Sequence, residues 1–454
     1  MKHALMALER MGLSTDLYEL TMAQAFLEAD IVERQATFDL SVRALPPERG
    51  YLIAAGLEQA LAYIRDLRFR PEALGYLESC GHFRQEFVDY LASMRFTGSV
   101  DAIPEGTVYF PPGPLLRITA PIIEAQILET YLLTTLAFQS MVASKASRVV
   151  EAAGGRAVID FSPRRDHGPQ AGLLAARASY IGGCIGTSNV LANDQFGIPM
   201  FGTMAHSFVM FHRDEEEAFR VFSRSYPGDP TLLIDTFDTL ESARIAVKLL
   251  PELAERGQRL AAVRLDSGDL LELSRQVREI LDEGGATDTK IFASGDLDEH
   301  KIAKLVADGA KIDGFGVGTQ LGTSGDAPTL SSTYKLVACD DEAGNEIPVI
   351  KLSAAKVSLP GRKQIWRRRG DDGELIGDAV GMEDEDLPGA PLLVPYMANG
   401  RLLRRAPALE EIRSRAADQV GSLPVGVRRL SDPQSYPVEI SPRLAALMEQ
   451  LQRR

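Results

Sequence analysis

Between about residue 156 and residue 317 the sequence repeats one pattern: a short apolar run, a polar or glycine-rich loop, and an amphipathic stretch. The apolar runs are typical of buried strands, and they recur roughly every thirty residues, the length of one βα unit. The amphipathic stretches begin after Asp or Ser and end at Gly, as helix capping favours. The predicted strands are 157–161, 232–237, 261–265, 291–293 and 312–317, and the predicted helices are about 240–255, 270–282 and 297–307.

Consecutive βα units fold into a parallel sheet covered by helices, either an open doubly wound sheet or a closed barrel. Each predicted strand is followed by charged or glycine-rich sequence, for example Arg164-Arg165 and Ser294-Gly295-Asp296. In a barrel, the C-terminal ends of several strands contribute to one site. The pattern therefore favours an α/β fold with a (β/α) barrel, which we place at residues 146–340.

The segments on either side of this region mix helical and strand patterns. We expect residues 1–145 to form an N-terminal α+β domain and residues 341–454 to pack with it. The predicted helices are 14–30, 53–66, 84–95, 122–150 and 442–454; the predicted strands are 36–43, 105–113 and 115–118, with two more in 356–367 around a Pro-Gly turn and a hairpin at 372–373.

Size and charge limit the classes of function. With 454 residues the chain is long enough for two or three domains. Its formal net charge of −14 disfavours binding to nucleic acid, because an acidic surface repels the phosphate backbone. The cysteines are far apart and odd in number, which argues against a disulfide scaffold and fits a reducing cytoplasm. The sequence has neither a signal peptide nor an apolar segment long enough to span a bilayer, so we expect a cytoplasmic protein without membrane contact.

One histidine stands out, in the sequence GTMAHSFV at residues 202–209. This residue, His206, follows a short apolar run at 198–201 that is typical of the end of a buried strand. Imidazole is largely neutral near pH 7, which suits it to nucleophilic or proton-transfer chemistry. A histidine packed in the core is an equally good interpretation of these residues alone.

Other strand ends carry residue types that bind anions. Arg264 and Asp266 are two positions apart, so they share one face of a strand. They form either an internal ion pair or a site in which the arginine holds an anion and the carboxylate steadies a developing positive charge. The turn Gly316-Val317-Gly318-Thr319 suits close approach to a phosphate, or simply tight packing.

Two further loops also have two interpretations each. Arg164-Arg165 belongs to a solvated loop or to an anion site, whereas Asp235 and Asp238 cap a helix or bind magnesium or a sugar hydroxyl. The sequence has neither a GxGxxG dinucleotide fingerprint nor a Walker lysine loop. Together these features favour a phosphorylated sugar or pyrophosphate substrate, with magnesium, over hydride transfer.

Seven segments, taken in order, resemble the nicotinate phosphoribosyltransferase family. The resemblance covers residues 14 to about 366, and an ordered set of this length is highly specific. The segments are STDLYELTM (14–22), GTMAHSFV (202–209), LLIDTFDT (232–239), VRLDSGDL (263–270), SGDLDE (294–299), FGVGTQL (315–321) with YKL (334–336), and LPGRK (359–363).

The resemblance implies an irregular barrel of the type II phosphoribosyltransferase kind beside a second α/β domain built from both ends of the chain. It implies a homodimer with active sites at the interface. The implied reaction converts nicotinate, 5-phosphoribosyl 1-pyrophosphate (PRPP), ATP and water into nicotinate mononucleotide, pyrophosphate, ADP and phosphate, with Mg²⁺, in NAD biosynthesis. Nicotinamide or quinolinate phosphoribosyltransferase, or a catalytically silent relative, are the alternatives.

The resemblance also implies residue roles. His206 is expected to be transiently phosphorylated by ATP, which would add negative charge beside the pyrophosphate and magnesium. Tyr18 and Phe161 are expected to enclose the nicotinate ring, with Asp16 and Tyr18 coming from the partner subunit. Ser188, where related nicotinamide-using enzymes have an aspartate, favours nicotinate's carboxylate over an amide. Magnesium is expected to be held with PRPP or pyrophosphate rather than by dedicated protein ligands. The remaining expected site residues are Arg164 and Arg264 for anionic groups, Asp266 beside the ribose or ring, Gly295, Gly318 and Thr319 for the 5-phosphate, and Asp235, Ser207, Ser294, Asp296 and Gly316 from the same motifs.

Overall fold

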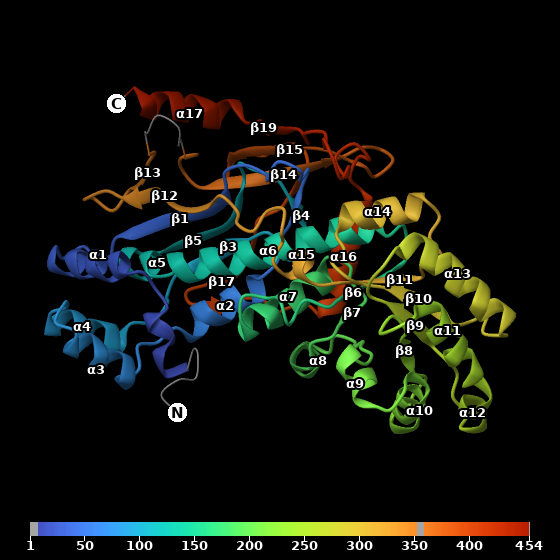
Figure 1. Cartoon of the computed structure of the whole chain (residues 1–454). Coiled ribbons are helices and arrows are strands. Elements are labelled where there is room, and N and C mark those ends of the chain that lie inside the picture. Colours follow the sequence, from blue (N-terminus) through green and yellow to red (C-terminus); the bar gives the residue numbers. More distant parts are fainter. Residues whose placement is uncertain (1–7, 352–357, 454) are drawn as a thin grey trace. The chain divides into compact units, whose positions relative to one another are not determined.

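The computed structural model describes residues 8–351 and 358–453 (Figure 1). The chain divides into two compact units: the residues up to Met141 together with those from Thr329 onward, and Val142–Pro328. The part of the predicted 356–367 hairpin at residues 356–357 lies outside the described residues, as does residue 454 of the predicted C-terminal helix.

The second unit is built on a parallel sheet whose strands follow a barrel order. Within the described residues the sheet has the order β7-β6-β11-β10-β9-β8. The first strand along the chain, β6, pairs with the last, β11, through Val158 and Phe315. That pairing of first with last is the order of a barrel, here a curled half-barrel, whereas in a doubly wound sheet the first strand pairs with a middle one. The predicted irregular barrel is confirmed. The strands are β6 (Ala157–Asp160), β7 (Gly186–Thr187), β8 (Thr231–Leu233), β9 (Ala262–Leu265), β10 (Lys290–Ala293) and β11 (Gly314–Val317).

The barrel has an opening between β7 and β8, the two edge strands of this sheet in the described part of the chain. A single parallel bridge joins Thr187 of β7 to Met200. Beyond this bridge, the hydrogen bond that links the segment to β8 comes from a side chain: the Thr203 hydroxyl donates to the carbonyl of Thr231 at 2.7 Å. The loop that contains His206 therefore begins at this opening.

Several helices of the second unit begin where an aspartate accepts backbone N–H groups. Asp238, Asp269 and Asp298 cap the helices that follow β8, β9 and β10 in this way. The predicted helix at 240–255 is wrong as a single helix: it is divided near Leu249, because Pro251 has no N–H to continue the ladder. The helices are α7 (Pro169–Ile181), α8 (Val190–Phe196), α9 (His206–Phe211), α10 (Glu215–Ser225), α11 (Thr239–Lys248), α12 (Leu250–Glu255), α13 (Leu270–Glu283), α14 (Glu299–Ala307) and α15 (Thr319–Gly322).

The first unit is built on a largely antiparallel sheet that both ends of the chain share. Its order, β13-β12-β1-β5-β3-β17-β18, places β1, β5 and β3 from the N-terminal part between strands that come from residue 332 onward. The apolar faces of this sheet and of the surrounding helices form one core. The strands are β1 (Gln35–Val42), β3 (Ser99–Ala102), β5 (Pro114–Pro121), β12 (Ser332–Asp340), β13 (Glu346–Pro348), β17 (Val394–Ala398) and β18 (Arg401–Leu402).

Smaller elements complete the first unit. The predicted helix at 122–150 is divided by a turn at residues 127–128 into α5 (Ile122–Gln126) and α6 (Glu129–Ala152), which leads into the second unit. The other elements are η1 (Leu8–Leu13), α1 (Leu17–Glu28), α2 (Leu57–Asp66), α3 (Pro71–Ser79), α4 (Gln85–Ser93), α16 (Leu409–Gly421) and α17 (Pro442–Gln452), the strand pair β2 (Leu52–Ile53) and β4 (Val108–Tyr109), and the sheet of β14 (Lys363–Arg369), β15 (Leu375–Met382), β16 (Ala390–Pro391) and β19 (Val438–Ile440).

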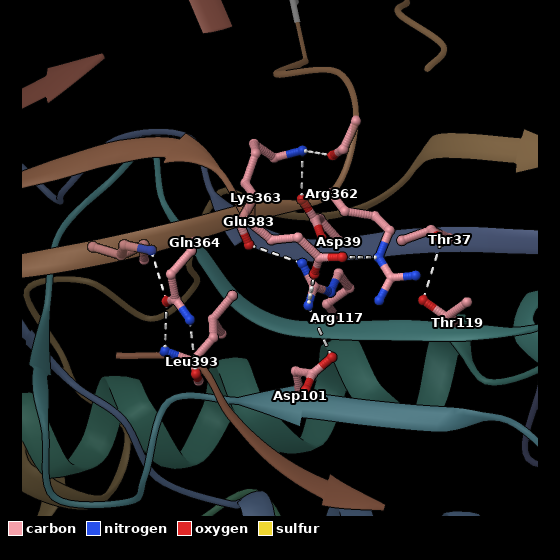
Figure 2. Close-up of polar contacts among 12 residues, drawn as sticks. Thr37, Asp39, Asp101, Arg117, Thr119, Arg362, Lys363, Gln364, Glu383 and Leu393 are labelled. Carbon is pink, nitrogen blue, oxygen red and sulfur yellow. Dashed lines mark hydrogen bonds and ion pairs between the residues drawn. The ribbon is translucent and has the colours of Figure 1, made fainter. Parts of the chain in front are cut away.

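A buried ionic network joins the two chain ends inside the first unit (Figure 2). Lys363 at the start of β14 forms an ion pair with Asp39 of β1, with 2.8 Å between Nζ and Oδ2. Arg117 of β5 lies between Asp101 (2.9 Å) and Glu383 (2.6 Å). Burial lowers the pKa of Lys363, while the Asp39 carboxylate opposes that shift. The network fixes β14 on the N-terminal sheet.

Candidate active site

The loops after the strands of the second unit lie on one rim of the barrel. Because neighbouring strands are parallel and in register, their C-terminal ends lie at the same end of the sheet. This rim carries Phe161 after β6, His206 after the Met200 bridge, Asp235 after β8, Asp266 after β9 and Ser294 after β10.

Arg264, Asp266 and Ser294 form a hydrogen-bonded cluster on this rim. The Arg264 guanidinium donates to Asp266 Oδ1 at 2.6 Å and to the Ser294 hydroxyl at 2.7 Å, and that hydroxyl donates to Asp266 Oδ1 at 2.5 Å. Burial alone would raise the pKa of Asp266, but the Ser294 hydrogen bond and the Arg264 charge outweigh it, so the pKa is lowered. Asp266 is therefore an ionised carboxylate next to a fixed cation.

An aromatic ring lies beneath the arginine. The Arg264 guanidinium carbon is 5.4 Å from the centre of the Phe161 ring. A Cβ atom on Gly316 would lie 2.3 Å from that same ring, so this glycine makes room for Phe161. For Gly316, tight packing is the better of the two interpretations. A cavity of about 50 Å³ adjoins Phe161 and Arg264, and Phe201 and Phe292 also line it.

His206 faces Asp266 from the first turn of α9. Its Nε2 lies 3.7 Å from Asp266 Oδ2, and its Nδ1 lies 3.2 Å from the Thr236 hydroxyl oxygen. The side chain is 38% exposed. His206 is therefore not packed in the core, and one ring nitrogen points to the carboxylate while a hydroxyl holds the other.

The two aspartates after β8 have different roles. Asp235 Oδ2 accepts the Asp266 N–H at 3.1 Å and the Ser267 hydroxyl at 2.6 Å, which ties the loops after β8 and β9 together. Its Oδ1 is buried and has no hydrogen-bond partner among the described residues. Asp238 instead caps α11 by accepting the N–H groups of Leu240 and Glu241. The cap interpretation therefore holds for Asp238 and does not describe Asp235.

Gly295 brings the loop after β10 against the loop after β9. Its φ is +96°, and a Cβ atom there would lie only 2.0 Å from the Asp266 carbonyl oxygen. Asp296 follows, also with a positive φ, of 48°. Across the rim, Gly318 and Thr319 open α15 after β11. The site thus needs glycine at position 295 for a close approach between two backbones.

The loop after β6 presents two arginines and hides a carboxylate that the sequence analysis did not single out. Arg164 and Arg165 are exposed, and the Arg165 N–H donates to the Ser162 carbonyl at 2.7 Å. The Ser162 hydroxyl donates to Asp166 Oδ2 at 3.0 Å. Burial and the nearby Asp160 carboxylate raise the pKa of Asp166 to about 6. No motif signals this shift, because it arises from burial after folding.

Asp16 and Tyr18 belong to the first unit. Asp16 Oδ2 accepts the Thr130 hydroxyl at 3.0 Å, and buried Glu19 accepts the Thr130 N–H at 3.2 Å. Tyr18 is 44% exposed. Burial and the neighbouring Glu129 carboxylate raise its pKa. The start of α1 is thus fixed on the start of α6, with the Tyr18 ring left accessible.

The first unit also has a cationic pocket of about 210 Å³. Its lining includes Arg43, Lys335, Lys351 and Lys363, with Asp39 as the acidic member. Such a surplus of cations on an acidic protein suits an anion. The sequence analysis did not assign these side chains a role, although Lys335 and Lys363 lie in two of its seven segments. The presence of these two lysines in family-like segments was the sequence signal that could have indicated an anion-binding pocket.

Comparison with known proteins gives the family. Models of nicotinate phosphoribosyltransferase match residues 13–137 (N-terminal domain), 157–367 (the family's central region) and 388–448 (C-terminal domain). The chain belongs to the nicotinate phosphoribosyltransferase family.

Relatives in this family match almost the whole chain. A nicotinate phosphoribosyltransferase of Mycobacterium tuberculosis is 48% identical over 97% of this chain and 94% of its own length. That of Bacillus subtilis is 37% identical over 95% and 93%. The crystal structure of human nicotinic acid phosphoribosyltransferase has a TM-score of 0.85 at 28% identity and covers 96% of this chain and 99% of the human one. The family assignment and the type II phosphoribosyltransferase fold predicted from the sequence are both confirmed.

Among residues 8–351 and 358–453, no group of three or more His, Cys, Asp or Glu side chains is placed to hold a metal ion. The described helices include none with the length and apolar character needed to cross a membrane. Cys80, Cys184 and Cys339 are free thiols.

Proposed function

We propose that this protein transfers the phosphoribosyl group of PRPP to nicotinate, forming nicotinate mononucleotide and pyrophosphate, and that ATP hydrolysis is coupled to this step in NAD biosynthesis. Family membership over nearly the whole chain supports the reaction. The arrangement of Arg264, Asp266 and His206 on one rim carries the proposal, because it combines a cation, an ionised carboxylate and an accessible imidazole.

The transfer step requires groups that hold anions and steady a cationic sugar. The pyridine nitrogen attacks the ribosyl carbon while the bond to pyrophosphate breaks, so positive charge develops on the sugar. Asp266, held ionised by Ser294 and Arg264, would lie beside that charge. Phe161 provides one face for the nicotinate ring, and Arg164 and Arg264 would pair with anionic groups of the substrates. Mg²⁺ would neutralise the leaving pyrophosphate, with most of its oxygen ligands coming from the substrate.

The remaining polar groups of the rim would complete substrate binding. Backbone N–H groups at Gly295, Gly318 and Thr319 would hold the 5-phosphate. Ser207 follows His206 in α9, and Asp296 follows Gly295, so both belong to the same loops.

ATP coupling would proceed through His206. A ring nitrogen attacks the γ-phosphorus, the bond to the β-phosphate oxygen breaks and ADP leaves; water later cleaves the nitrogen–phosphorus bond and releases phosphate. The exposure of His206 and its distance of 3.7 Å from Asp266 support this role. A phosphoryl group there would place new negative charge next to Asp266 and Arg264, which changes substrate affinity.

We propose a cytoplasmic homodimer in which Asp16 and Tyr18 complete the partner's site. Two exposed apolar surfaces support it: Leu17 (57% exposed) with Tyr18 on α1, and Met210 (61%) with Phe211 (90%) on α9. Mixing Tyr18→Ala and His206→Ala proteins tests it, since the mixed dimer has one intact site. Recovery of about a quarter of wild-type ATP-stimulated activity is expected for random exchange. If both groups serve one chain's own site, mixing recovers nothing.

One assay separates the candidate activities. The protein is incubated with PRPP, Mg²⁺ and either nicotinate or nicotinamide, with and without ATP. We expect mononucleotide from nicotinate, more of it with ATP, and ADP released with it. Ser188 is exposed after β7, where a carboxylate would repel nicotinate. Product from nicotinamide alone would overturn the substrate assignment, and no product from either would favour a silent relative.

A further inference from the structure

The first unit contains a cavity of about 560 Å³ that shares no residue with the rim of the barrel or with the cationic pocket. It lies between α2 and the hairpin of β17 and β18, whose residues line it. Its volume falls in the range of small-molecule sites, roughly 300–1,000 Å³. The lining residues that carry the argument are Leu57, Leu61, Tyr396, Leu403, Arg404 and Arg405.

One side of this cavity is apolar. Leu57 and Leu61 of α2 are buried in the core, and Tyr396 of β17 is buried beside them. At the outer edge Leu402 and Leu403 remain 38% and 53% exposed. Adjacent exposed leucines at the mouth of a cavity leave apolar surface in water, which a ligand with a flat apolar body would cover.

The other side is cationic and includes a stacked pair. The Arg404 guanidinium carbon lies 5.2 Å from the centre of the Tyr396 ring, which orients that cation over an aromatic wall. In the part of the chain that the structure describes, neither Arg404 nor Arg405 has an acidic partner. Two uncompensated arginines are notable on a chain with a net charge of −14. Arginine pairs of this kind bind phosphate oxygens.

Acceptor groups also line this cavity, one of them exposed (Glu58) and one buried (Glu105). The Glu58 and Glu105 carboxylates both belong to its lining. Glu105 is 4% exposed, and its Oε1 accepts the Gly56 N–H at 2.6 Å, which fixes the carboxylate at the start of α2. A ligand with amino or hydroxyl donors would find acceptors here, and its anionic end would be directed to the arginines.

We propose that this cavity is a second ligand site that binds a nucleotide, with the base against Tyr396 and Arg404, hydroxyl or amino groups toward Glu58, and the phosphate on Arg405. The aromatic wall, the acceptors and the unpaired cations each match one part of such a ligand. The inference does not depend on the proposed phosphoribosyl transfer, because none of these residues lies on the barrel rim.

Equilibrium binding of AMP to the full-length protein tests the site, with excess PRPP and Mg²⁺ present so that the barrel rim is occupied. We expect AMP to bind, and adenosine or inorganic phosphate alone to bind at least about tenfold more weakly, because each offers only one part of the ligand. Arg404→Ala with Arg405→Ala should weaken AMP binding at least about tenfold. Arg401→Ala is the matched control, since Arg401 is exposed on β18 and does not line the cavity.

A second variant tests the cavity without removing charge. Ala62→Trp would place an indole in it from α2, where Ala62 lines the cavity and is partly exposed. AMP binding should be lost, while phosphoribosyl transfer keeps the wild-type rate in every variant. Absence of AMP binding at 1 mM, on the order of weak ligand affinities, would overturn the proposal. So would AMP binding that is seen only when PRPP is left out, or unchanged binding in the double arginine variant.

Discussion

The buried pair of Asp39 and Lys363 gives a prediction whose size follows from the structure. The two side chains are 4% and 2% exposed, with Nζ and Oδ2 2.8 Å apart. In Asp39→Asn the lysine keeps its hydrogen bond to the Leu359 carbonyl, 2.8 Å away, but loses its counter-charge, while Arg117 still opposes its protonation. Removing one partner of a buried pair costs about 3–5 kcal/mol. We expect about 3 kcal/mol here, since carbonyl oxygens still solvate the ammonium.

The dependence of this loss on pH has a definite sign. Burial lowers the pKa of Lys363 in the folded protein, so the unfolded chain binds the proton more tightly. Stability is then reduced at low pH and recovers as the pH rises through the folded pKa toward the unfolded value, about 10.4. Without Asp39 the folded pKa falls further. The deficit of Asp39→Asn should therefore be larger at pH 7 than at pH 9.5.

The single tryptophan makes the measurement direct. Trp366 lies on β14 close to Lys363 and is 5% exposed, so its fluorescence reports unfolding of the first unit. Urea titrations give the free energy of unfolding for each variant. The double variant Asp39→Leu with Lys363→Met, which removes both charges, should recover to within about 1 kcal/mol of wild type. A loss below about 1 kcal/mol in Asp39→Asn, or a loss that grows with pH, would refute the reasoning.

Three further predictions concern the barrel rim. His206→Ala should abolish ATP hydrolysis and ATP stimulation but leave ATP-independent transfer, as measured by ADP and mononucleotide release; unchanged ATP turnover would remove the phosphohistidine role. Gly295→Ala should lower kcat/KM at least about a hundredfold, because its Cβ would lie 2.0 Å from the Asp266 carbonyl oxygen. Gly309→Ala, also at positive φ but with its Cβ no closer than 3.8 Å to a neighbouring atom, should cost only about 1 kcal/mol of stability and keep kcat. Asp166→Asn should be more stable than wild type by about 1 kcal/mol at pH 8, since a folded pKa raised to about 6 makes the ionised form unfavourable above that pH. Thermal unfolding at pH 4.5 should show that gain reduced to about a third, because the carboxyl of the unfolded chain is still mostly ionised there; an equal gain at both values would exclude the titration of Asp166 as its cause.

The barrel could be predicted because each of its βα units has the same pattern of apolar, polar and amphipathic segments in the sequence. Apolar runs and Gly-terminated helices marked β8 to β11 and the helices between them. The opening could not be predicted, because β7 has only two residues and Met200 joins it by a single bridge, too short for any periodic pattern. Pro251 was a visible sign that the helix at 240–255 would divide, but amphipathicity continues across it.

The sequence predicts those residues of the candidate site that lie at the end of a predicted strand or directly after it. Arg264, Asp266 and His206 do, and the structure brings them together. Whether Gly316 serves packing or binding could be decided only from the folded structure, because this glycine makes room for the ring of Phe161, which is far away in sequence. The shifted pKa of Asp166 depends on desolvation and on Asp160, which no local pattern encodes.

The opening of the barrel between Met200 and β8 has a mechanical consequence for the loop that carries His206. The rim loops after β6, β9, β10 and β11 continue from strands that are hydrogen-bonded on both sides, so their displacement would strain a ladder. At the opening, a hydroxyl contact from Thr203 to Thr231 takes the place of that ladder. When the charge on His206 changes, the histidine loop can therefore shift. The shift costs about one hydrogen bond, that of Thr203 to Thr231, or roughly 1 kcal/mol. Hydrogen exchange at residues 202–205 should be faster than in the loop after β9, and slower exchange there would contradict this view.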